Sequence, residues 1–219
     1  MTTAVKILAH LRRRRSPRDI EGQRRYGIAP RGEHLGIRAP VLREIARRHR
    51  RDHALALALW ATAVHEARII ATLIDDPRQV TRRQMDHWIR DCDNWAVTDA
   101  CCCVLFDRTP FAIEKARSWT TRKAEYVKRG GFVLMAGLAV HRKELPDAVF
   151  HEFLPVIRRE ATDERNFVKK AVNWALRQIG KRNPRLRRAA IAAAKDIRKL
   201  DSRPARWIAA DALRELENR

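Results

Sequence analysis

The chain has 219 residues, of which 45% are hydrophobic and 33% are charged, and this apolar content excludes a disordered chain. Lys and Arg number 47 against 26 for Asp and Glu, so the formal net charge is +21, which attracts polyanions: nucleic acid first and an anionic membrane surface second. The longest uncharged runs, 54–64 and 130–140, fall short of the roughly 18 apolar residues that a membrane span needs.

The N-terminal segment, residues 1–38, is predicted to contain helices followed by a loop. Residues 1–15 carry no apolar block with a small-residue cleavage site behind it, so we expect no secretory signal and a cytoplasmic protein. Ser16 followed by Pro17 is typical of a helix start, and three glycines mark a loop over 27–39. The arginines at 12–15 fit an additional DNA contact and a solvated helix end equally well.

Residues 39–219 are predicted to form a series of helices, because strong helix formers dominate and apolar residues recur at helical spacing. Helix starts are expected at the pairs Ala39-Pro40, Thr109-Pro110, Leu145-Pro146 and Asn183-Pro184, and a helix end is expected at Gly180. Buried stripes are expected at Val168, Val172, Ala175, Leu176 and Ile179, and at Trp207, Ala210, Leu213 and Leu216. The spacing predicts roughly ten to twelve helices, mostly of about 10–16 residues.

Five segments share one pattern, a polar or charged first turn followed by an apolar helix rich in small residues. They begin at Val64, Trp95, Val127, Val168 and Ala205, at spacings of 31, 32, 41 and 37 residues. A more amphipathic helix lies between them, for example at 80–90 and 147–160. Helix pairs that repeat every ~30–47 residues indicate a right-handed α-solenoid of HEAT-like pairs. We expect one all-α domain over 1–219, with the repeats in 39–219 and a plain helical bundle as the alternative.

The first turns of the five repeated helices are expected to line a basic concave face. They carry His65, Glu66, Arg68, Trp95, Asp99, Lys128, Arg129, Lys169, Lys170, Trp174, Arg206 and Trp207. Basic side chains hold phosphates and indoles pack on sugars or bases, so this chemistry suits duplex DNA. A solenoid with such a groove works as a monomer.

Other notable residues are assigned structural roles. The four cysteines, Cys92 and 101–103, are expected to be small buried hydrophobes of a reducing cytoplasm, since neighbours on a helix cannot ligate one metal together. Trp60, Trp88 and Trp119 are assigned to the core, and His65-Glu66 to a helix start. Gly130-Gly131 interrupts a predicted helix and indicates the close approach of a neighbouring helix or a ligand.

Trp95 and Asp99 place a carboxylate beside an indole, because residues four apart share a face of a helix. Periodicity alone favours a structural role for this carboxylate. No zinc-protease, phosphate-loop or nucleophile-elbow motif competes with it.

The sequence resembles the AlkD-like DNA alkylation repair family from about residue 20 to the C-terminus, and five sequence blocks carry the resemblance. The blocks are HLGIRAPVLREIARRH (34–49), LWATAVHEARIIATLIDDP (59–77), DNWAVTD (93–99), YVKRGGF (126–132) and NFVKKAVNWALRQIGKRNP (166–184). The resemblance implies HEAT-like repeats around duplex DNA, and an N-glycosylase that releases cationic N3- and N7-alkylated purines without metal or cofactor.

On motif position, the resemblance implies Trp95, Asp99 and Trp174 as the catalytic set and Arg129 as a phosphate contact. Lys128, Lys169, Lys170 and Arg206 are expected to be further DNA contacts. The chain departs from the family pattern at Ala96, where some members carry an acid, and at Gly130-Gly131. Branches of the family also share the fold without glycosylase activity.

Three functions are therefore compatible with the sequence. A glycosylase acting on alkylated duplex DNA, associated with a prokaryotic nucleoid, is the first. A module that binds DNA or RNA structures without catalysis is the second, and a protein-binding scaffold is the third. The excess of basic residues argues against the scaffold unless its partner is acidic.

Overall fold

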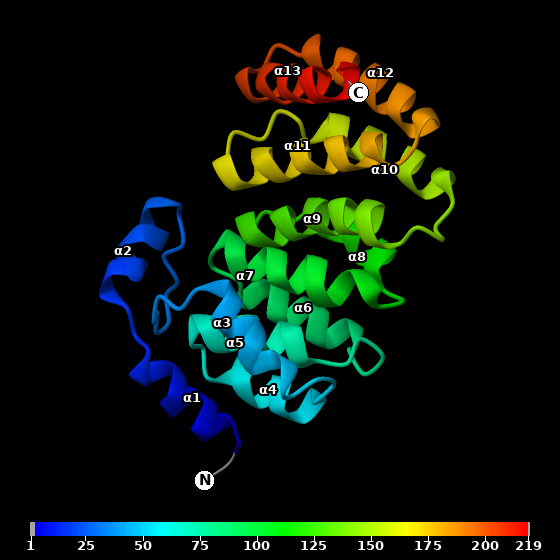
Figure 1. The fold of residues 1–219 in the computed structure, drawn as a ribbon. Helices are drawn as coiled ribbons and strands as arrows, with labels where there is room; N and C mark the ends of the chain where they lie inside the picture. The colour runs from blue at the N-terminus through cyan, green and yellow to red at the C-terminus, as the bar shows by residue number, and fades with distance from the viewer. Residues whose placement is uncertain (1–2, 219) are drawn as a thin grey trace. The chain divides into compact units, whose positions relative to one another are not determined.

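The computed structural model describes residues 3–218 and divides into two compact units, 1–109 and 110–219. Figure 1 shows that its regular elements are helices, and no strand occurs in the described residues. Thirteen α-helices are present there, slightly more than the sequence predicted. The all-α fold of helix pairs is confirmed, whereas a single repeat domain over 1–219 stays a prediction.

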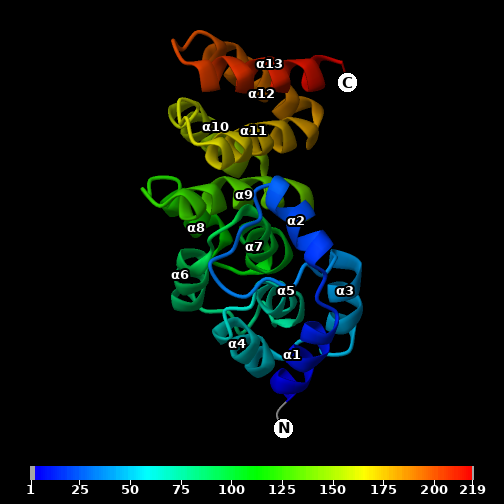
Figure 2. The same ribbon diagram turned by 90° about the vertical axis from the view of Figure 1, so that its left-hand side faces the viewer.

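The first unit contains seven α-helices and two short helical segments. They are α1 (Thr3–Arg13), α2 (Pro17–Arg25), α3 (Ala39–Arg47), α4 (His53–Ala61), α5 (His65–Ile74), α6 (Arg82–Asp91), α7 (Trp95–Ala100), a π-helical turn (Cys101–Leu105) and a 3₁₀ turn (Phe106–Arg108). Ser16 caps α2 by accepting a hydrogen bond from the Asp19 amide, as predicted. The loop after α2 spans residues 26–38 and passes beside α5 and α7 (Figure 2).

The second unit consists of six helices in two layers. They are α8 (Ala112–Trp119), α9 (Glu125–His141), α10 (Asp147–Arg159), α11 (Asn166–Lys181), α12 (Pro184–Arg198) and α13 (Arg203–Glu217). Helix α11 packs between α9 and α13, and α10 packs against α12 (Figures 1 and 2). The layer of α9, α11 and α13 corresponds to three of the five predicted repeat segments.

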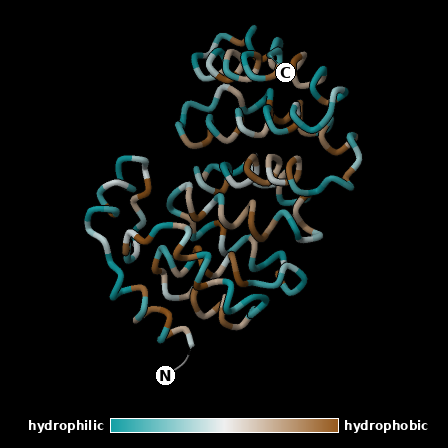
Figure 3. The backbone as a smooth tube through the Cα atoms, viewed as in Figure 1, coloured by the Kyte–Doolittle hydropathy of each residue, from teal (hydrophilic) through white to brown (hydrophobic). Residues whose placement is uncertain are grey.

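The core of the second unit is centred on α9 and α11. Figure 3 shows the hydrophobic residues of α9, and residues 130–139 of this helix are all buried. The stripe predicted on α11, from Val168 to Ile179, is confirmed, since its members are fully buried. The structure explains the second glycine of the pair: a Cβ atom at Gly131 would lie 2.9 Å from the Thr120 backbone nitrogen at the end of α8. A neighbouring helix, and not a ligand, makes that close approach.

Three local predictions are wrong. Helix α8 begins at Ala112 and not at Thr109-Pro110, because residues 109–111 form a turn before it. Gly180 does not end its helix; it lies inside α11, where its small size admits the Leu216 side chain of α13. The stripe predicted on α13 is misplaced by part of a turn: Ile208, Ala209 and Ala212 are buried with the two leucines, whereas Trp207 and Ala210 are exposed.

The core assignments of the three tryptophans and of Cys92, Cys101 and Cys102 are confirmed, whereas Cys103 is only partly buried. Trp60 and Trp88 stack with ring centroids 4.0 Å apart, and Trp119 is buried in the second unit. All four cysteines are free thiols, and Cys92 and Cys101 face each other in the core with 4.0 Å between their sulfur atoms. Burial raises the pKa of the Cys101 thiol well above its usual range, so this residue is unreactive.

Candidate active site

Trp95 and Asp99 lie on the short helix α7, one turn apart. The helix begins there because the Asn94 side chain, which is buried, accepts hydrogen bonds from the amides of Ala96 and Val97. Directly after α7 the backbone widens into the π-helical turn Cys101–Leu105. Such π turns are rare and frequently accompany functional sites, and no apolar pattern in the chain indicates this one.

A hollow of about 540 Å³ in the first unit is lined by both Trp95 and Asp99. Its walls come from α2, the loop after it, α3, α5, α7 and the π-helical turn, and most of the lining residues are apolar, for example Ile37, Leu42 and Ile69. Arg38 and Arg43 also line the hollow. Asp99 is half-buried there. The volume falls within the range of small-molecule sites, and a carboxylate in a largely apolar hollow has a strengthened electrostatic effect.

The Trp95 indole is held in place by the loop after α2. Its Nε1 donates a hydrogen bond to the backbone carbonyl oxygen of Tyr26, 2.8 Å away. The Tyr26 side chain itself is 77% exposed beside this contact, the most exposed large apolar side chain of the described residues. Sequence reasoning missed Tyr26, because a lone tyrosine in a glycine-containing loop carries no periodic signal.

Glu66 fixes the other wall of the hollow. Its fully buried carboxylate accepts hydrogen bonds from the backbone amides of Leu35, Gly36 and Ile37. Gly36 has a φ of 74°, a conformation that favours glycine. Glu66 was expected to be a helix-start residue, and it does occupy the first turn of α5, but its larger role is to anchor this loop.

His65 lines the same hollow and is 3% exposed. Burial, reinforced by the neighbouring His34 ring and by Arg68 and opposed by Asp93, lowers the pKa of His65 to about 4. The two imidazoles meet edge to face, with 5.0 Å between their centroids. His65 is therefore neutral at pH 7 and contributes no positive charge beside Asp99.

Trp174 and Arg129, the other residues implied by the family motifs, belong to the second unit. Trp174 is half-buried on α11, and its Nε1 donates to the Gln178 side-chain oxygen at 3.0 Å. Arg129 is 6% exposed, and its Nη1 donates to the Phe167 carbonyl oxygen at 2.7 Å. Its guanidinium thus ties α9 to the start of α11, and its role as a phosphate contact stays a prediction.

The predicted DNA-contacting lysines differ in how far they are engaged within the protein. Lys128 lies between the carboxylates of Glu160 and Asp163, with its side chain 13% exposed. Lys169 places its ammonium 5.0 Å from the centroid of the Trp207 ring. Lys170 is exposed and forms no ion pair with the described residues, which makes it the most accessible of the three.

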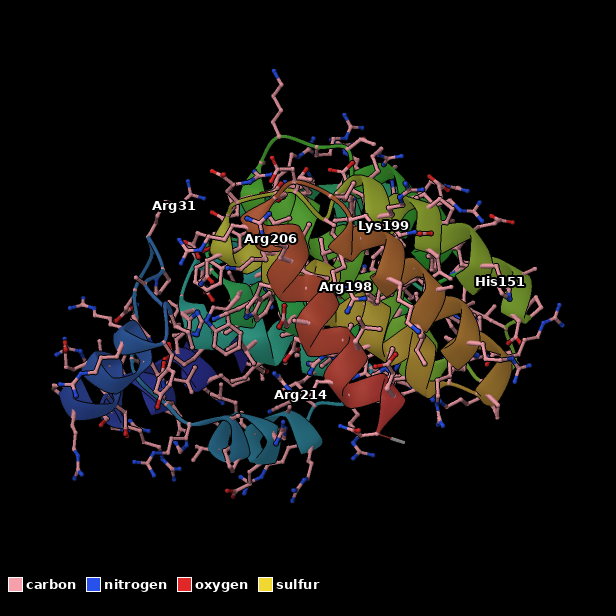
Figure 4. All side chains as sticks on the ribbon, turned by 90° about the horizontal axis from the view of Figure 1, so that it is seen from above. Arg31, His151, Arg198, Lys199, Arg206 and Arg214 are labelled. Atoms are coloured by element: carbon pink, nitrogen blue, oxygen red, sulfur yellow. The ribbon has the colours of Figure 1, made fainter. Side chains whose placement is uncertain are left out.

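The C-terminal helices present further basic side chains. Figure 4 labels Arg198 and Lys199 at the end of α12, and Arg206 and Arg214 on α13. Arg206 is exposed and pairs with Asp201 at 3.1 Å. Exposed guanidiniums of this kind are able to exchange a surface carboxylate for a phosphate, because such surface ion pairs are weak.

Neither a metal centre nor a membrane span is found in residues 3–218. No group of three or more His, Cys, Asp or Glu residues in that range is arranged to hold a metal ion. None of the helices described is long and apolar enough to cross a membrane.

Comparison with known proteins places this architecture in a family. A family model described as "DNA alkylation repair enzyme" matches residues 7–216. A solved structure described as "a new family of proteins related to the HEAT-like repeat DNA glycosylases with affinity for branched DNA structures" superimposes with a TM-score of 0.82 at 16% identity, covering 99% of this chain and 95% of that one. No curated protein sequence matches the chain significantly. The match over residues 7–216 shows that the chain belongs to the DNA alkylation repair enzyme family.

Proposed function

We propose that the protein is a DNA N-glycosylase that releases cationic N3- and N7-alkylated purines from duplex DNA. The observation that carries the proposal is the pairing of Trp95 and Asp99 in one hollow, with the indole oriented by the Tyr26 carbonyl. Membership of the alkylation repair family and the net charge of +21 support DNA as the substrate. We propose a monomer acting without metal or cofactor in a prokaryotic cytoplasm.

The reaction does not require a strong general acid. An N3- or N7-alkylpurine already carries a positive charge, so the base leaves without being protonated. Positive charge then develops on the deoxyribose, and a fixed carboxylate near C1′ stabilises it. Asp99 is assigned this role, and it also orients the attacking water. The apolar residues around it lower the local polarity and so favour the charge interaction.

The indoles are assigned to holding the damaged nucleotide. The Trp95 ring, and that of Trp174 in the second unit, would pack on the cationic sugar, each contributing about 0.5–2 kcal/mol. Arg129, Lys169, Lys170 and Arg206 are assigned to phosphates, which position the duplex and read no sequence. Lys128 binds a phosphate only if DNA displaces its two carboxylate partners, Glu160 and Asp163.

The experiment is release of methylated purines from methylated duplex DNA by wild type and by Asp99→Asn under single-turnover conditions. The amide keeps the size of the side chain but removes its charge, so we expect DNA binding to persist and excision to fall by at least about a hundredfold. Asp86→Asn, on α6 and outside the hollow, is the control and should excise like wild type. Equal rates for wild type and Asp99→Asn would remove Asp99 from the mechanism.

A second function is favoured by the solved relative, which is described as having affinity for branched DNA structures. Under this alternative the protein binds DNA junctions and excises nothing. The two functions are separated by measuring the affinity of the protein for a four-way junction and for a linear duplex of equal length, together with base release. No base release by wild type together with junction-selective binding would support the alternative. Base release by wild type alone would support the glycosylase.

A further inference from the structure

The indole of Trp207 is exposed and takes no part in the buried face of its helix, α13. Helix α13 buries Ile208, Ala209 and Leu213 against the rest of the unit, and Trp207 lies outside that face with 40% of its surface exposed. Exposing a large aromatic side chain forgoes the free energy that its burial would contribute. An indole in such a position, at the edge of a hollow, is suited to stacking on a ligand.

The hollow beside Trp207 combines three kinds of chemistry. It has a volume of about 460 Å³ and is lined by Glu164, Lys169, Arg203, Pro204 and Trp207. Lys169 comes from the first turns of α11 and Arg203 from the start of α13, so two neighbouring helices each direct one cation to it. The Lys169 ammonium lies over one face of the Trp207 ring, 5.0 Å from its centroid, so a ligand that stacks on this indole uses the other face or displaces the ammonium.

Glu164 is the unexpected member of this set. Its neighbour Asp163 is engaged by Lys128 and Arg165, whereas Glu164 is exposed and forms no ion pair with the described residues. A carboxylate without an ion pair, in a hollow that two cations also line and in a chain of charge +21, does not help to bind phosphate. It is an acceptor for neighbouring N–H donors.

We propose that this hollow binds one unpaired guanine nucleotide of a DNA substrate. The base stacks on the Trp207 indole, and the flanking phosphates are bound by Lys169 and Arg203. The Glu164 carboxylate accepts two hydrogen bonds from the Watson–Crick edge of guanine, which among the four bases presents two adjacent donors, N1–H and N2–H. The inference rests on the proposed DNA-binding function and adds a specificity to it.

The test measures binding of the full chain to unmodified DNA by fluorescence anisotropy. One duplex is blunt, and four others carry a single unpaired G, A, C or T at one end. We expect wild type to bind the duplex with the unpaired G most tightly. Trp207→Ala should weaken that complex by about five- to a hundredfold, the range of one lost base stack, and change the affinity for the blunt duplex less than about twofold. Trp207→Phe should restore part of the loss.

Two further variants make the test specific. Glu164→Gln should abolish the preference for G over the other three nucleotides, because a glutamine presents one acceptor and one donor. Val140→Ala, an exposed apolar position of the same unit outside the hollow, should behave like wild type. Equal affinity of wild type for all four overhangs, or an equal loss on blunt and overhang duplexes in Trp207→Ala, would overturn the inference. No alkylated base is present, so these results are independent of whether the glycosylase proposal holds.

Discussion

Trp95 donates its indole N–H to the backbone carbonyl of Tyr26, 69 positions earlier in the chain, across 2.8 Å. The bond joins the first turn of α7 to the loop after α2, and thereby sets the orientation of an aromatic wall of the candidate active site. Because the acceptor is a backbone atom, the contact depends on the loop conformation and not on the identity of residue 26.

Trp95→Phe tests this relationship. Phenylalanine keeps an aromatic face but cannot donate the hydrogen bond, so we expect a stability loss of about 1 kcal/mol and a fall in single-turnover base release of about tenfold. Tyr26→Phe is the matched control, because it leaves the carbonyl acceptor in place. Wild-type release by Trp95→Phe would mean that the bond does not position the ring for the reaction.

Glu66 is predicted to contribute more to stability than any exposed acid of the chain. In Glu66→Gln one oxygen remains for the N–H donors of residues 35–37, but the second oxygen, which also accepts from Leu35, becomes an NH₂ group facing that same amide, and the negative charge that strengthens all these bonds is lost. We expect a loss of roughly 2–4 kcal/mol in the free energy of unfolding, measured by urea denaturation. Glu44→Gln, at an exposed acid of α3, should change it by less than about 0.5 kcal/mol, and equal effects of the two substitutions would contradict the anchoring role.

His65 predicts a pH dependence of stability. Its pKa is about 4 in the folded protein against 6.5 for an ordinary histidine, chiefly because of burial. The unfolded chain therefore takes up a proton first as the pH falls, and stability declines from about pH 6.5 down to about pH 4. The full contribution is up to roughly 3 kcal/mol. In His65→Gln the urea midpoint should therefore fall less between pH 7 and pH 4.5 than it does in wild type. A variant whose midpoint falls as steeply as that of wild type would contradict this role of His65.

Helix positions, the repeat and much of the core could be predicted from the sequence, because they follow from spacing along one helix. The stripe on α11 is such a case. The loop anchor at Glu66 and the bond from Trp95 to Tyr26 could not, because each joins residues about 30 or more positions apart through a backbone atom, whose conformation no side-chain pattern encodes. Trp207 belonged both to the apolar stripe expected on α13 and to the concave face expected at its first turn, and the structure places it outside the buried face. Several alanines on α13 leave its apolar face wide, so periodicity did not fix which side is buried.

Replacement of two helical glycines by alanine is expected to change the free energy of unfolding in opposite directions. Both Gly131, in α9, and Gly22, in α2, would gain up to about 1 kcal/mol of helix propensity on replacement by alanine. At Gly22 nothing lies within 4 Å of the added Cβ, so Gly22→Ala should raise the free energy of unfolding by about 0.5–1 kcal/mol.

At Gly131 the added Cβ would stand 2.9 Å from the backbone nitrogen of Thr120 and 3.1 Å from the Ala116 carbonyl oxygen. Backbone atoms of α8 cannot move aside as a flexible side chain does, so overpacking of about 1–3 kcal/mol should outweigh the gain in propensity, and Gly131→Ala should lower the free energy of unfolding. Urea denaturation of both variants beside wild type measures the pair. A stabilised Gly131→Ala would show that α8 and α9 can separate at no cost, and that the glycine serves some purpose other than their close packing.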